Sequence, residues 1–156
     1  MNFFEVMTIS ILDIISELWN DEKLPIINGL VKADGSFYEI KVEDCQPVTA
    51  DYQPSTFDVT AKNYYEWYSS VLGSPFLTHA EITYYCGECS QGSDGFLLAV
   101  NNKNNTVEWL FFDEEANPLE KMWVENDEIH AMSNLNIEWI FPINAPEKLR
   151  SINHGF

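Results

Sequence analysis

Positively charged residues are scarce in this sequence, and their scarcity excludes several classes of function. The 156 residues include 8 Lys and Arg against 25 Asp and Glu, which gives a formal net charge of −17 at pH 7. Arg150 is the only arginine, and the lysines are scattered singly. Nucleic-acid binding by phosphate neutralisation needs a basic stripe or patch. We therefore expect no direct nucleic-acid partner and, for the same reason, no partner membrane.

Three further features are absent. The cysteines number only 3, an odd count, which argues against the disulfide framework of a small secreted protein. The apolar stretch 3–19 is interrupted by Glu5, Asp13 and Glu17, and it lacks the basic start and small-residue cleavage site of a signal peptide. Glycine-rich phosphate loops are missing as well. We expect a cytoplasmic protein, with no cofactor, catalytic residue or metal ligand that the sequence can assign.

Apolar residues, by contrast, are plentiful. They make up 46% of the chain, and aromatic residues make up 14%. Disordered acidic segments are poor in both, because they have too little apolar surface to bury. The acidic residues should therefore cover a folded core, and the length predicts a single domain spanning 1–156.

The periodicity of apolar residues predicts two helices. Residues 3–19 place apolar side chains on one helical face, and the segment 20–25 ends the pattern with Asn20-Asp21 and Pro25. A second helix is predicted over about 60–72, where Ala61, Tyr64, Tyr68 and Val71 recur at helical spacing before Gly73-Ser74-Pro75.

The rest of the chain predicts strands. The Asp34-Gly35 pair between 26–32 and 36–42 indicates a hairpin. The runs 95–100 and 107–112 are apolar on both alternating sets of residues, which is typical of central strands covered on both faces. Shorter strands are predicted at 81–86, 119–124, 128–132 and 137–141, where short apolar-rich runs are separated by brief turns. The predicted fold class is α+β, with two helices packed on an antiparallel β-meander sheet of roughly five to eight strands.

Cys86-Gly87-Glu88-Cys89 is the sharpest local motif. A C-x-x-C pair can form a redox couple or half of a zinc site. The residues after it, 90–95, favour a loop and not the helix that lowers a thiol pKa in thioredoxin-like proteins. Possible further zinc ligands are Cys45, His79, His130 and His154, none at a motif spacing. Two ordinary thiols at a strand end are the simpler interpretation.

The acidic residues are concentrated in the second half of the chain. Between Glu108 and Glu138 there are nine acids and one base, Lys121, a net charge of −8. In a sequential meander, alternate turns emerge at the same end of the sheet. This topology predicts an exposed negative patch for partner binding, beside the turn Ser133-Asn134, formed by Glu88, Asp94, Asp113, Glu114 and Glu115. Glu125, Asp127 and Glu128 should lie at the opposite end with the Asn-rich loop 101–105.

The segment 109–142 carries a family resemblance. The features that carry it are Asp113-Glu114-Glu115, Asn117-Pro118, Asn126-Asp127-Glu128-Ile129-His130 and Trp139-Ile140-Phe141-Pro142. With the size and acidity of the chain, this segment is similar to the immunity proteins of bacterial contact-dependent inhibition and polymorphic toxin systems. The resemblance implies a one-to-one complex with a basic toxin domain, often a nuclease, whose active site or substrate groove is blocked.

Two other classes of function stay open. The chain could be a small zinc or redox protein using its cysteines, or an enzyme whose site assembles from dispersed residues. It could also be an adaptor that recognises a basic protein segment without neutralising an enzyme. Salt-dependent association would favour an electrostatic binding role over catalysis.

Overall fold

The structure is a computed structural model that describes residues 10–48, 51–55 and 63–155. The elements in this part of the chain are α2 (Ile11–Asn20), β1 (Lys23–Pro25), β2 (Gly29–Lys32), β3 (Phe37–Glu39), β4 (Val42–Glu43), β5 (Gln46–Pro47), β6 (Pro54–Ser55), β7 (Tyr68–Gly73), β8 (Phe76–His79), β9 (Ile82–Cys89), β10 (Gly95–Asn101), β11 (Thr106–Asp113), β12 (Leu119–Glu125), β13 (Glu128–Ser133), β14 (Ile137–Pro142), the 3₁₀ helix η1 (Pro146–Lys148) and β15 (Arg150–Asn153).

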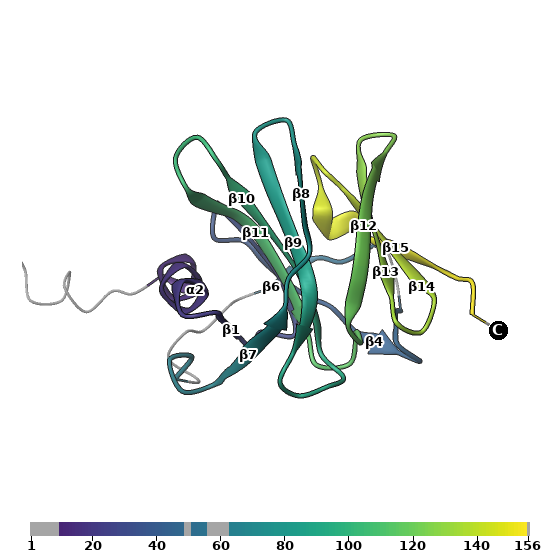
Figure 1. Cartoon of the computed structure of the whole chain (residues 1–156), viewed down its shortest axis with the longest axis horizontal. Coiled ribbons are helices and arrows are strands. Elements are labelled where there is room, and N and C mark those ends of the chain that lie inside the picture. Colours follow the sequence, from purple (N-terminus) through teal and green to yellow (C-terminus); the bar gives the residue numbers. More distant parts are fainter. Residues whose placement is uncertain (1–9, 49–50, 56–62, 156) are drawn as a thin grey trace, which may run out of the picture.

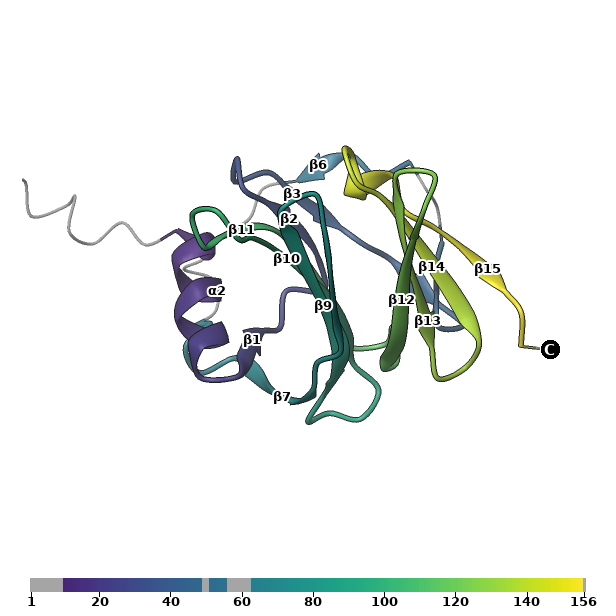
Figure 2. The ribbon, with the colours of Figure 1, turned by 45° about the horizontal axis from the view of Figure 1, so that its top comes forward.

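These elements form three layers. A nine-stranded sheet in the order β1-β7-β9-β10-β11-β2-β3-β6, with β8 also paired to β9, lies in the middle. Helix α2 covers one face of it, and a four-stranded sheet, β12-β13-β14-β15, covers the other (Figures 1 and 2). The short hairpin β4-β5 completes the strand pairing. The protein is thus rich in antiparallel strands, with α2 as the one α-helix among its described residues.

Helix α2 confirms the described part of the predicted N-terminal helix. Ser10 caps it, because its Oγ accepts a hydrogen bond from the backbone N–H of Asp13 at 3.2 Å. The helix ends at Asn20, where the sequence predicts its end, and its apolar residues Ile11, Ile14, Ile15 and Leu18 are buried against the sheet. Residues 3–9 of the prediction lie outside the described part. No helix among the described residues is both long and apolar enough to cross a membrane.

The second predicted helix is wrong over its described residues. Residues 64–66 form a turn, and Tyr68–Gly73 form strand β7, which pairs with β1 and β9. Within this strand Ser69, a polar residue by sequence, is buried and donates its hydroxyl to Asp94 at 2.7 Å. Tyr and Val favour strands, so their helical spacing is weak evidence for a helix, and pairing with β1 and β9 determines the structure here. Residues 60–62 of the prediction lie outside the described part.

The central strands confirm the prediction that they are covered on both faces. Alternate residues of β10 and β11 contribute to two separate cores: Phe96, Leu98, Leu110 and Phe112 pack towards α2, while Leu97, Ala99, Trp109 and Phe111 pack towards the four-stranded sheet. This is the period-two alternation of a strand, with both sets apolar. The hairpin predicted around Asp34-Gly35 is also confirmed, because β2 pairs with β3 across that turn.

The strand-rich second half is not one continuous meander. Strands β9, β10 and β11 pair in sequence, as do β12 to β15, but the chain leaves the first sheet after Asp113 and begins a second one at Leu119. The second sheet packs its own apolar face, including Trp139 and Phe141, onto the first. Stacking buries both apolar faces, which one extended sheet would leave exposed.

Candidate functional site

Strand register brings the predicted acidic residues to one end of the central sheet. Gly95 pairs with Glu88 on one side and with Asp113 on the other, so the turn 89–94 and the loop 114–118 emerge together. The turn after Ser133 adjoins them, since Asn134 donates its N–H to Pro118 O at 2.9 Å. The β10–β11 and β12–β13 connections lie at the opposite end (Figure 1). The predicted placement of both acidic groups is confirmed.

The predicted exposure is wrong for Asp94. This side chain is 0% exposed, and its two carboxylate oxygens accept hydrogen bonds from the Cys89 backbone N–H at 3.0 Å and from the Ser69 hydroxyl at 2.7 Å. It ties strand β7 to the β9–β10 turn. A carboxylate used in this way is structural, and it offers no surface to a partner.

Asp113 is also buried, at 5% exposure, and its Oδ1 accepts the backbone N–H of Glu115 at 2.8 Å. The pKa of Asp113 is raised to about 7, mainly by burial; the Glu115 N–H opposes the rise, and the nearby Glu115 and Glu114 carboxylates contribute to it. Glu88 and Glu115 are exposed and Glu114 is half-buried. Three of the five predicted residues therefore remain as accessible charges.

The loop 114–118 is held firmly in place. The side chain of Asn28 binds Glu114 twice: its Nδ2 donates to Glu114 Oε2 at 2.7 Å, and its Oδ1 accepts the Glu114 N–H at 2.9 Å. Ser93 donates its hydroxyl to Glu114 O at 2.9 Å. Gly95 allows the loop to pack closely on the sheet, because a side chain there would collide with the carbonyl of Asn117. The Glu114 carboxylate is thus held in one position by Asn28.

A groove of about 360 Å³ opens beside this loop, and we call it the acidic groove. It is lined by Asn28, Glu39, Ile40, Lys41, Val42, Glu43, Asp113, Glu114 and Glu115. Five of these residues are acids and one is a base. Within the described part of the chain, none of the five acids takes part in an ion pair; the observed pairs lie elsewhere, at Lys32–Glu147, Arg150–Glu128 and Glu138 with His130 and His154.

Sequence reasoning missed the residues that strands β2 to β4 bring to the acidic groove. Glu39 on β3 pairs with Gly29 on β2, and Gly29 pairs with Phe112 near the end of β11. Only β2 therefore separates Glu39 from the end of β11. The hairpin was a signal that could have found Glu39. The pairing of β2 with β11, on which the placement depends, joins segments about 80 residues apart and has no local signature.

The two cysteines of the C-x-x-C motif point to opposite faces of β9. Cys86 lies in the core beneath the four-stranded sheet, where its Sγ contacts Leu119 O at 3.3 Å, and Cys89 lies in the core beneath α2. Residues three apart in a strand alternate faces. The pair therefore cannot share a metal ion or form a redox couple in this fold. Burial raises the pKa of the Cys86 thiol to about 12 and raises the pKa of the Cys89 thiol as well.

The histidines do not complete a metal site either. His130 Nδ1 and His154 Nε2 both contact the Glu138 carboxylate, at 2.7 and 2.8 Å, on the outer face of the four-stranded sheet. No group of three or more His, Cys, Asp or Glu side chains among residues 10–48, 51–55 and 63–155 is placed to hold a metal ion.

Comparison of the chain with protein-family models, curated proteins and solved structures finds no match. The function must therefore be inferred from the fold and the acidic groove.

Proposed function

We propose that this chain is a cytoplasmic immunity protein that binds a basic toxin domain, often a nuclease, one-to-one and blocks its active site or substrate groove. The observation that carries the proposal is the acidic groove. It has five carboxyl groups and one lysine, none of its five acids takes part in an ion pair with a described residue, and its loop is fixed by Asn28. A surface whose charged groups are already held in place, as Glu114 is, loses little entropy when a cationic surface docks.

The net charge of −17 supports the same role. A strongly charged surface steers an oppositely charged partner and can raise the association rate towards ~10⁸ M⁻¹s⁻¹ at low salt. Nuclease clefts are positive because they hold phosphate. The acidic groove would compete with the nucleic acid for that cleft.

The test begins with pull-down from the native host, using the purified chain, and co-expression of the recovered partner domain with and without the chain. We expect a basic partner whose toxicity the chain abolishes. The association rate, measured by stopped-flow fluorescence, should fall steeply as NaCl increases. A rate that is insensitive to salt would contradict electrostatic docking.

Two charge-neutralising variants locate the docking surface. Glu115→Gln and Glu43→Gln remove exposed charges from the acidic groove, and each should slow association several-fold at low salt. Glu125→Gln removes an equally exposed charge at the opposite end of the molecule and is the matched control. Equal slowing by all three variants would show that net charge acts without a defined site.

One observation favours a second candidate, acid–base catalysis at Asp113. A carboxyl group with a pKa of about 7 in a groove has the property expected of a catalytic acid or base. The two functions separate on Asp113→Asn, which keeps the acceptor for the Glu115 N–H. A catalyst would lose its activity in this variant, whereas a binding protein would still neutralise its partner.

A further inference from the structure

Two large apolar side chains stand exposed at the edge where the chain passes from β7 to β8. Phe76 is 69% exposed and Leu72 is 64% exposed, the two highest values among the described large hydrophobic residues. Exposed apolar groups that cluster at one place commonly mark an interaction surface. Neither residue belongs to the acidic groove.

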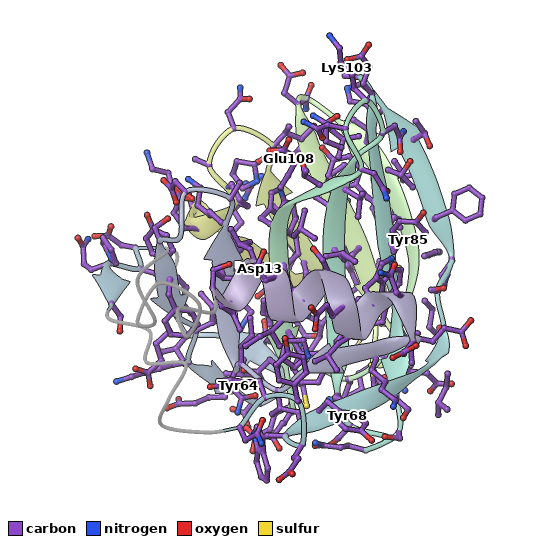
Figure 3. The ribbon with its side chains drawn as sticks, turned by 90° about the vertical axis from the view of Figure 1, so that its left-hand side faces the viewer. Asp13, Tyr64, Tyr68, Tyr85, Lys103 and Glu108 are labelled. Carbon is purple, nitrogen blue, oxygen red and sulfur yellow. The ribbon has the colours of Figure 1, made fainter. Side chains whose placement is uncertain are left out.

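An aromatic row connects these two residues to helix α2. The rings of Phe76 and Tyr85 lie 6.0 Å apart, and those of Tyr85 and Trp19 lie 5.1 Å apart. Figure 3 shows Tyr85 beside the end of α2 that lies away from Asp13, on the face that the helix covers. Trp19 and Leu72 also line one hollow. The exposed residues therefore form a single patch, and aromatic side chains are the usual anchors of protein interfaces.

Two hollows meet at Gly73 and form what we call the edge groove. The first, of about 410 Å³, is lined by Trp19, Asn20, Glu22, Val71, Leu72, Gly73 and Ser74. The second, of about 300 Å³, is lined by Gly73, Pro75, Gly87, Glu88, Pro118, Leu119 and Glu120. The lining mixes apolar surface with three glutamates and includes no basic residue.

The local backbone explains why the edge groove exists. Strand β9 pairs with β7 near its end and with β8 near its start, so the chain runs along one edge of β9 and its strand pairing is interrupted at 74–75. Gly87 permits the close approach of this segment to β9, because a side chain there would collide with the carbonyl of Gly73. Gly73 itself faces open space, with no atom within 4 Å of where its Cβ would lie. Strand β8 pairs with β9 and with no other described strand, so β8 is an edge strand beside the edge groove.

We infer that the edge groove, with the exposed Phe76 next to its lining residue Pro75, binds an extended basic segment of the protein partner. Apolar side chains of this segment contact Leu72 and Phe76, and its Lys or Arg residues face Glu22, Glu88 and Glu120. The inference rests on the proposed function, which supplies the partner. The edge groove would be a second contact site for that partner, in addition to the acidic groove. Charge complementarity selects the occupant: the lining carries only negative charge, and its apolar part suits alternate side chains of an extended chain.

The probe is a phage-displayed library of random twelve-residue peptides, selected on the whole protein and counter-selected on Gly73→Leu. The leucine would fill the groove without a clash at its Cβ. We expect enriched sequences that combine Lys or Arg with apolar residues, and we expect the synthetic peptide to bind about tenfold more weakly to Phe76→Ala and to Leu72→Ala. Both substitutions affect exposed residues, and circular dichroism checks that the variants fold.

The matched control is Ile152→Ala, which removes a large apolar side chain that is 45% exposed on β15. It should leave the affinity of the peptide unchanged. Peptides without basic enrichment, or equal binding to Gly73→Leu, Phe76→Ala and the unchanged protein, would overturn the inference.

Failure of the inference and failure of the proposed function give different results. If Gly73→Leu and Phe76→Ala neutralise the toxin domain as well as the unchanged protein does, while Glu43→Gln and Glu115→Gln associate slowly, the edge groove is not a contact and the proposed function stands. If a basic peptide binds the edge groove but the chain protects no cell from any basic partner it captures, the proposed function fails and the edge groove remains a binding site.

Discussion

At the scale of single residues, Asp94 and Asp113 show how the same residue type takes different roles at the same end of the sheet. Asp94 receives a hydrogen bond on each carboxylate oxygen, and Asp113 receives one from the described residues, on Oδ1. Hydrogen bonding stabilises a buried carboxylate, whereas desolvation without enough donors raises its pKa. Asp113 is thus the buried carboxyl group of the acidic groove that titrates near neutral pH.

Asp113 should make stability depend on pH. Its pKa is about 7 in the folded protein against 3.8 for an unperturbed aspartate. Between these values the unfolded chain releases the proton and the folded chain keeps it, so this group lowers the free energy of unfolding as pH rises from about 4 to about 7. Asp113→Asn should therefore stabilise the protein by up to about 4 kcal/mol at pH 8 and have little effect at pH 4.

Urea unfolding of both proteins at the two pH values measures this difference. Comparing variant with parent cancels the titration of the other 24 acidic residues, to the extent that they titrate alike in both proteins. An Asn variant that is less stable than its parent at pH 8 would show that the Asp113 carboxylate is well solvated or paired.

At the scale of elements, the predictability of each strand depends on how local its cause is. The hairpin at Asp34-Gly35 and the strands β10 and β11 were predictable because turn residues and apolar runs lie within the segments themselves. Strand β7 was not, because it pairs with the distant strands β1 and β9 and its buried Ser69 bonds Asp94, 25 residues away. The same contact explains why the burial of Asp94 was missed, although its position at the sheet end was predicted from the order of the strands.

The geometry of strand β9 predicts how readily the cysteine thiols react. Because Cys86 and Cys89 lie in different cores, both should resist alkylation by iodoacetamide in the folded protein, and no disulfide should link them. Cys45 is only half-buried and should react first. Mass spectrometry after timed alkylation, with and without denaturant, measures all three. A disulfide between Cys86 and Cys89, or one bound zinc ion per chain, would contradict the strand geometry.

At the scale of the whole molecule, the charge of −17 opposes compaction. The described ion pairs neutralise only Glu128, Glu138 and Glu147 among the acids, so most carboxylates repel one another across the surface. If the proposed function holds, this repulsion is the cost of a charge that speeds association with a basic partner.

Salt should therefore stabilise the isolated protein. Raising NaCl from about 10 mM to about 200 mM shortens the range of charge repulsion, and we expect the melting temperature at pH 7 to rise by a few degrees. The same addition at pH 4.2, near the isoelectric point of the sequence, should change it less. Differential scanning calorimetry at both pH values checks this, and a melting temperature that falls with salt at pH 7 would show that attractive pairs dominate.

The sharing of the central sheet by two cores has a consequence for how the molecule comes apart. Each of the strands β9, β10 and β11 places alternate side chains in both cores, as Leu97 and Leu98 do on β10. Detachment of helix α2 would expose one face of these strands to water while their other face still packs in the second core. Detachment of the four-stranded sheet would expose that other face instead. Neither outer layer can leave without weakening the support of the other. The middle sheet thereby couples the two layers into one cooperative unfolding unit.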